Sequence, residues 1–310
     1  MAGGLRAYDG APTQPLSMVR CIISGEVRDD RVAKLPVHRW ALLIVVVLLL
    51  ALGIAILVRQ SSRAARPDQL VPLYTTSAGQ WAAACSEVSD TGHKSLIVAN
   101  VQQGPGTAPV PAWTKIIDSC AGYGRAHVLG YVWTDYGRGG PGALGSIETQ
   151  IQAWYTMYPG HIDGIFLDGV SDTVPGIGTR NRYFYRSLAG YVHHKEGMAS
   201  QVVFNFGTDP DAGWMFDAAS ALDADVIVTF EGSYNIAGQN PLTAWTPAGW
   251  ERRYPASDFA ALVHSAPSTA ALAEPAAACR ALREKHLGYL YVGTSYNELP
   301  AYFSALVHSC

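Results

Sequence analysis

Short apolar runs recur along the chain from Gln69 to the C-terminus, and more polar segments separate them. The runs are rich in Val, Leu, Ile and aromatic residues, a composition typical of β-strands. The segments between them mostly have the periodicity of helices. There are eight such runs, at residues 70–74, 95–101, 127–133, 164–168, 201–205, 225–231, 259–264 and 288–292.

Eight strands alternating with helices over about 240 residues predict a (β/α)8 TIM barrel for residues 69–310. The runs are apolar almost without interruption, as expected of parallel strands that are buried on both faces. A doubly wound open sheet would show the same alternation of strand and helix, so it is the alternative fold.

A longer apolar segment precedes the predicted barrel. Residues 40–58, WALLIVVVLLLALGIAILV, contain no charged side chain. About 20 apolar residues in a helix cross the hydrocarbon core of a bilayer, so we predict a single transmembrane helix here, with a buried core helix as the alternative. The segment is too long, and begins too late, for a cleaved signal peptide. The chain then divides into a flexible tail (1–39), the transmembrane helix (40–58), a stalk (59–68) and the barrel (69–310).

Basic residues and cysteines indicate on which side of the membrane each part lies. Slightly more Lys and Arg residues flank the span on its N-terminal side than on its C-terminal side, which favours a cytoplasmic N-terminus. Cys21 precedes the span and an even number of cysteines follows it, a pattern consistent with disulfides in an oxidising space. We therefore expect a signal-anchor in the cell membrane and an extracellular barrel.

The cysteines after the span can be placed on the predicted helices. Cys85 falls in the helix after the first strand, and Cys120 falls in the helix after the second. Consecutive helices are neighbours on the outside of a barrel, so these two could form a disulfide. Cys279, before the eighth strand, and Cys310, in the final segment, are neighbours again and could form another. The other two pairings stay open.

Charge is distributed unevenly along the chain. The formal net charge is −3, although the tail and the stalk are both net basic, so the barrel region is net acidic. An acidic domain is a poor partner for the phosphate backbone of nucleic acids. We therefore expect no nucleic-acid partner.

Two carboxylates stand directly after apolar strand residues, at the ends where barrel enzymes carry their active sites. Asp168 ends the stretch GIFLDGV, and Glu231 ends the stretch VIVTFE. Two carboxylates that face each other across a cleft are the usual equipment for glycoside hydrolysis. The alternative for Asp168 is a turn or helix cap, whereas Glu is a poor cap and no obvious helix begins after Glu231.

Other polar and aromatic residues are expected around the same mouth, where they would bind a substrate. Aromatic rings offer the C–H groups of a sugar a flat apolar surface, although most of them have packing as their alternative role. Trp245, Trp250 and Tyr296 are further aromatic residues near the predicted mouth. The predicted substrate-binding residues are Tyr74, Asn100, Trp133, Asp135, Tyr136, Asn205, Tyr234, His264 and Thr294.

Several other chemistries lack their sequence signatures. The chain contains no H-E-x-x-H, no C-x-x-C, no Walker loop and no G-x-S-x-G elbow. The sequence therefore predicts neither a metal nor a cofactor.

The order and spacing of several motifs resemble those of the spherulin-4 family, also called spherulation-specific family 4. The resemblance covers nearly all of residues 69–310. It rests on LVPLY (70–74), VLGYVWTDYG (128–137), WYTMYPG with HIDGIFLDG (154–169), VVFNFGTDP (202–210), VIVTFEGSYNIA (226–237) and FAALVHSAPS (259–268).

The resemblance implies a (β/α)8 barrel and an endo-acting glycoside hydrolase. Its substrate would be α-1,4-linked galactosamine or N-acetylgalactosamine in an exopolysaccharide, and no metal would take part in catalysis. By resemblance Asp168 is the nucleophile and Glu231 the general acid/base of a retaining mechanism, with the reverse assignment of the two roles left open.

The sequence departs from the family pattern at two strand ends. A second acid usually follows the Asp of strand four, whereas Gly169 stands here. Thr294, within Gly293-Thr294-Ser295, stands at the end of strand eight, where acidic residues are common. An inactive or weakly active polysaccharide-binding barrel is therefore the alternative to the glycosidase. A barrel enzyme of another class would need a phosphate or cofactor site near strands seven and eight, for which the sequence shows no motif.

Overall fold

The computed structural model describes Val47 and residues 67–172, 180–196, 200–211, 223–234, 236, 241–242, 244–266 and 284–309. The chain divides into two compact units, Met1–Arg63 and Ala64–Cys310, and the description below concerns the second. The predicted tail, the predicted transmembrane helix apart from Val47, and most of the stalk lie outside the described residues. Within the described ranges, no helix is both long and apolar enough to cross a membrane.

Eight parallel strands close into a barrel in the order in which they occur along the chain. This closure confirms the predicted (β/α)8 architecture and rules out the doubly wound open sheet. The strands are β1 Asp68–Pro72, β2 Ser95–Ala99, β3 Ala126–Trp133, β4 Gly164–Asp168, β5 Gln201–Asn205, β6 Val226–Ser233, β7 Phe259–His264 and β8 Tyr289–Val292.

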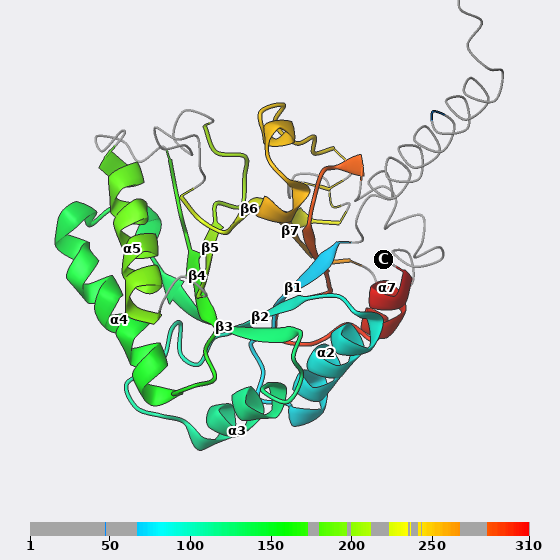
Figure 1. Cartoon of the computed structure of the whole chain (residues 1–310), viewed down its shortest axis with the longest axis horizontal. Coiled ribbons are helices and arrows are strands. Elements are labelled where there is room, and N and C mark those ends of the chain that lie inside the picture. Colours follow the sequence, from blue (N-terminus) through cyan, green and yellow to red (C-terminus); the bar gives the residue numbers. More distant parts are fainter. Residues whose placement is uncertain are drawn as a thin grey trace, which may run out of the picture. The chain divides into compact units, whose positions relative to one another are not determined.

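Helices lie along the outside of the strands, as Figure 1 shows for α2, α3, α4 and α5. The helices that the structure describes are α2 Ala78–Thr91, α3 Pro111–Cys120, α4 Leu144–Met157, α5 Arg180–Glu196 and α7 Phe303–Ser309. Short 3-10 turns are η1 Asp135–Gly137, η2 Gly140–Ala143, η3 Glu251–Arg253 and η4 Ala256–Asp258.

Helix α4 shows how closely this outer layer packs. The indole of Trp154 is fully buried, and its Nε1 donates to the carbonyl of Tyr131 in β3 at 2.8 Å. A Cβ atom on Gly130 would lie 2.5 Å from the same indole. The sequence therefore has glycine at a point where the indole of α4 lies directly against the strand.

The barrel begins one residue earlier than the sequence predicted. Asp68, which the sequence placed in the stalk, is the first residue of β1, and its Cα is paired with that of Tyr289 in β8. This pairing closes the barrel between residues far apart in the sequence. Local composition around Asp68 carries no sign of it.

One of the two predicted disulfides is present. Cys85 of α2 and Cys120 of α3 are bonded, with their Cα atoms 5.6 Å apart. The bond joins consecutive helices of the outer layer, as predicted. Cys279 and Cys310 lie outside the described residues, so the second bond stays a prediction.

Candidate active site

Three polar side chains meet at the carboxyl ends of neighbouring strands. Asp168 ends β4, Asn205 ends β5 and Glu231 lies near the end of β6. The amide nitrogen Nδ2 of Asn205 donates to Asp168 Oδ1 at 2.7 Å and to Glu231 Oε2 at 2.7 Å. One neutral side chain thus holds the two acids together.

This shared donor fixes how far apart the two carboxylates are. Both accepting oxygens lie 2.7 Å from one nitrogen atom, so their separation cannot exceed twice that distance. The two hydrogens of an amide nitrogen diverge by about 120°, which puts the oxygens roughly 4.7 Å apart if both bonds are straight. This separation between the two nearest oxygens is compatible with the ~5–5.5 Å between the carboxyl groups of retaining glycosidases.

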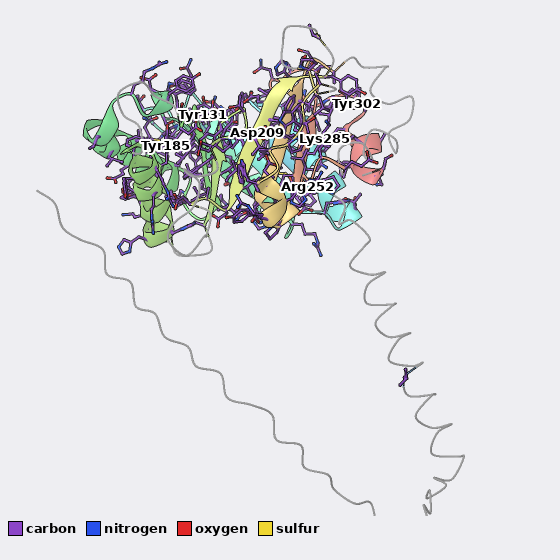
Figure 2. The ribbon with its side chains drawn as sticks, turned by 90° about the horizontal axis from the view of Figure 1, so that it is seen from above. Tyr131, Tyr185, Asp209, Arg252, Lys285 and Tyr302 are labelled. Atoms are coloured by element: carbon purple, nitrogen blue, oxygen red, sulfur yellow. A yellow bond between two sulfur atoms is a disulfide. The ribbon has the colours of Figure 1, made fainter. Side chains whose placement is uncertain are left out.

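Each carboxylate also accepts a hydrogen bond from a tyrosine. The hydroxyl of Tyr131 donates to Asp168 Oδ2 at 2.7 Å, and that of Tyr296 donates to Glu231 Oε1 at 2.9 Å. The ring of Tyr74 contacts the rings of both tyrosines, with centroid distances of 5.8 Å to Tyr131 and 6.0 Å to Tyr296. Burial and nearby Asp168 raise the pKa of Tyr131, which keeps it a proton donor at neutral pH. Tyr131 is labelled in Figure 2.

The two acids differ in their electrostatic surroundings. Burial raises the pKa of Glu231, and the charge of Asp168 raises it further, while hydrogen bonds from Asn205 and Tyr296 oppose the rise. The charge of His264 also opposes it. Desolvation disfavours the ionised form of an acid and favours the protonated form that a proton donor needs.

A β-bulge in β6 directs the side chain of Glu231 toward this site. The register between β6 and β7 shifts between Val228 and Phe230, which marks a β-bulge at Thr229. Val228 is paired with Asn205, so the two side chains share a face of the sheet. Glu231 is three residues after Val228, and without the bulge its side chain would point to the opposite face. The backbone N–H of Glu231 donates to the carbonyl of Gly207 at 2.9 Å, which holds this part of the strand.

The structure brings part of the predicted mouth close to the acids. Trp133 is paired with Asp168 across β3 and β4. His264 lies with its ring 6.3 Å from that of Tyr296, and its Nδ1 is 2.9 Å from the hydroxyl of Ser265.

The other predicted residues have their own local partners. Asp135 is exposed and pairs with Arg138 at 3.1 Å, and Tyr136 packs edge-on against Trp133. Asn100 Oδ1 accepts from the backbone of Gly104 at 3.1 Å, and Thr294 donates to Glu298 at 3.0 Å. The half-buried Tyr234 donates its backbone N–H to the carbonyl of His264 at 3.0 Å.

Sequence reasoning missed Tyr131 and did not place Tyr296 among the binding residues. Tyr131 lies two residues before Trp133, so strand periodicity puts both on the same face, and this signal was available. Tyr296 follows β8 in a loop, and no periodicity predicts its direction. Asp168 does not serve as a cap, since its carboxylate accepts from Tyr131 and Asn205. Among the described residues no cluster of three or more His, Cys, Asp or Glu is arranged to hold a metal ion.

Comparisons with known proteins agree with this architecture. The family model Spherulin4, described as spherulation-specific family 4, matches residues 69–310. No curated protein matches the chain. Among solved structures, Sph3 of Aspergillus clavatus in complex with GalNAc is similar, with 21% identity and a TM-score of 0.62 over 78% of this chain and 96% of that one. The endo-beta-N-acetylglucosaminidase of Cordyceps militaris, in its apo form, has 8% identity and a TM-score of 0.50 over 78% of this chain and 90% of that one. At these identities, the likeness to the solved structures concerns the fold.

Proposed function

The chain belongs to spherulation-specific family 4, and from this premise we propose that its barrel is a glycoside hydrolase of the retaining type. The observation that carries the proposal is the pair of carboxylates, Asp168 and Glu231, joined through the single amide of Asn205. Two acids at this spacing across the mouth of a barrel suit a double displacement at an anomeric carbon.

The surroundings of the two acids support different roles for them. Glu231, whose pKa is raised by burial, is the proton donor to the glycosidic oxygen. Asp168 is held by the neutral donors Tyr131 and Asn205, and its carboxylate is the nucleophile that attacks the anomeric carbon as the leaving group departs. Glu231, now ionised, then takes a proton from the water that attacks the same carbon and releases Asp168.

We propose a polymer of α-1,4-linked galactosamine or N-acetylgalactosamine as the substrate. Membership of the family supports this choice, and so does the GalNAc complex of the similar structure Sph3. We also propose that residues 40–58 anchor the chain in the cell membrane with the barrel outside. The Cys85–Cys120 disulfide supports an oxidising surrounding for the barrel.

A polysaccharide-binding barrel without turnover is the second candidate. It is favoured by Gly169, which provides no carboxylate beside Asp168 where the family resemblance leads one to expect an acid. The Asp168–Glu231 pair is sufficient for a two-carboxylate mechanism, so we place the enzyme first.

The deciding experiment is hydrolysis of α-1,4-galactosaminan of varied acetylation by the full-length chain. Reducing ends would be followed over time, and the anomer released would be identified by NMR. Asp168→Asn and Glu231→Gln would be run beside the unaltered chain, with circular dichroism to verify folding. We expect cleavage with retention, lost in both variants. Binding without cleavage would favour the second candidate, and cleavage that survives both substitutions would contradict the assignment of the acids.

A further inference from the structure

An indole ring lies directly beside the carboxylate at the end of β4. Trp133 is the last residue of β3, and its Cα is paired with that of Asp168. Residues paired in this way direct their side chains to the same face of the sheet. Trp133 is also 36% exposed, whereas the residues before it in β3 are buried or half-buried. The strand therefore presents an aromatic surface at the mouth, next to Asp168.

The indole fills the space that a side chain at position 169 would need. A Cβ atom on Gly169 would lie 2.4, 2.7 and 2.9 Å from Cζ3, Cη2 and Cε3 of the Trp133 ring. Gly169 also has a φ of +65°, a conformation that costs other residues roughly 1 kcal/mol or more. Only glycine fits both requirements without moving the ring.

The backbone under the ring is held in place, so it cannot move aside instead. The hydroxyl of Thr134 lies 2.8 Å from the carbonyl oxygens of both Asp168 and Gly169. The hydroxyl of Tyr185 donates to the Gly169 carbonyl at 3.3 Å. A side chain at position 169 would therefore displace the indole rather than the chain.

A second aromatic ring and an ion pair support the indole from the side. Tyr136 packs edge-on against Trp133, with centroids 5.1 Å apart and an interplanar angle of 84°. The guanidinium of Arg138 lies 4.8 Å from the centre of the Tyr136 ring and pairs with Asp135 at 3.1 Å. Asp135 and Tyr136 have φ values of 50° and 55°. Two successive residues in this costly conformation are typical of functional loops.

We propose that Trp133 is the platform of a sugar subsite adjoining Asp168, and that Gly169 is the residue that makes room for it. Its ligand is the apolar C–H face of a pyranose ring, because an exposed indole gains from covering such a face. The inference rests on the proposed function for the class of ligand, but not on turnover.

Binding and kinetics of matched variants test this subsite. The full-length chain, kept soluble with mild detergent, would be titrated with a fully N-acetylated α-1,4-galactosaminan oligosaccharide, and kcat and KM would be measured with the same probe. For Trp133→Ala we expect Kd and KM to rise about ten-fold, with kcat changed far less. Trp133→Phe should recover part of the loss. Tyr123→Ala, at the opposite end of the barrel, is the control and should change neither constant.

A double-mutant cycle tests the pairing of the two residues. Gly169→Ala alone should raise Kd about as much as Trp133→Ala, because its Cβ displaces the ring. Added to Trp133→Ala, it should raise Kd less than about two-fold further. Losses that multiply, or an unchanged Kd in Trp133→Ala, would overturn the inference.

The outcomes separate this inference from the proposed function. An unaltered chain that binds the probe through Trp133 but does not cleave it would retain the platform and contradict the glycosidase. Cleavage with an unchanged KM in Trp133→Ala would retain the glycosidase and contradict the platform. A probe that is neither bound nor cleaved would contradict both.

Discussion

Carboxylates at the two ends of the barrel are held in different ways. At the amino ends of the strands, Asp68, Asp163 and Asp225 each accept a backbone N–H, from Lys94 at 2.9 Å, Val128 at 2.8 Å and Val202 at 2.8 Å respectively. A histidine stands beside each of them, at 3.6, 3.6 and 3.1 Å. At the carboxyl ends, Asp168 and Glu231 accept instead from the side chains of Tyr131, Asn205 and Tyr296.

We interpret this difference as a division between carboxylates that stabilise the fold and the two acids of the proposed active site. A carboxylate that satisfies the N–H of a neighbouring strand and has a histidine beside it stabilises the fold and does not need to change its state. Two acids that share one neutral donor repel each other, and the charge of Asp168 contributes to the raised pKa of Glu231. Burial favours the protonated form of Glu231, as a proton donor requires.

Removing the shared donor should have the largest effect. In Asn205→Leu both carboxylates lose a hydrogen bond while the branched shape of the side chain is kept, so we expect kcat/KM for galactosaminan to fall by about 10²–10³. Reducing-end assays would measure this, with circular dichroism as the folding control. A loss below about three-fold would show that Asn205 does not organise the two acids.

At the other end, Asp225→Ala should lower stability and leave catalysis unchanged. The substitution leaves the N–H of Val202 without its acceptor and His193 without its partner. We expect the free energy of unfolding to fall by about 1–2 kcal/mol, measured by urea denaturation. Asp90→Ala, at an exposed position of α2, is the matched control. A change in kcat at a temperature where the variant is folded would contradict a purely structural role of Asp225.

A third carboxyl group sharpens the comparison, because it is fully buried. Glu251 is fully buried in η3, and burial, followed by its contact with Asp209, raises its pKa to about 9. The folded chain therefore keeps this proton while the unfolded chain loses it near pH 4–5, so stability declines as the pH rises from there toward 9. The slope from this group is at most about 1.4 kcal/mol per pH unit.

Glu251→Gln tests this dependence, since a neutral amide replaces the neutral acid. We expect the free energy of unfolding, followed by denaturant titration between pH 5 and 9, to depend less steeply on pH in the variant. The same pH slope in both proteins would contradict the burial of a protonated Glu251.

The smallest effect concerns the tyrosine on Glu231. The Tyr296 hydroxyl donates to Glu231 and stabilises its ionised form. Tyr296→Phe should therefore raise the pKa of Glu231 further, and the alkaline limb of the kcat/KM profile should move to higher pH. The rate at the optimum should fall no more than about ten-fold. A shift to lower pH would contradict the assignment of Glu231 as the proton donor.

The sequence by itself determined the architecture and the positions of the two candidate acids. Eight apolar runs predicted the strands, and the ends of two of them predicted Asp168 and Glu231. Cys85 and Cys120 could be paired because consecutive helices are neighbours in this fold. The membrane anchor and the extracellular location stay predictions, since residues 1–46 and 48–66 lie outside the described part.

Only the tertiary structure decided how the site is assembled. The periodicity of a strand tells which residues share a face, but a bulge changes that count, and the one at Thr229 is what turns Glu231 inward. Asn205 was recognisable as a residue of the mouth, yet its two bonds depend on the register of β4, β5 and β6. In the sequence, Gly169 stands where the family resemblance leads one to expect an acid. In the structure, the indole of Trp133 occupies the space that a side chain at position 169 would need. Apolar patterning is a local property of the chain, while these contacts join residues that only the closure of the barrel brings within reach.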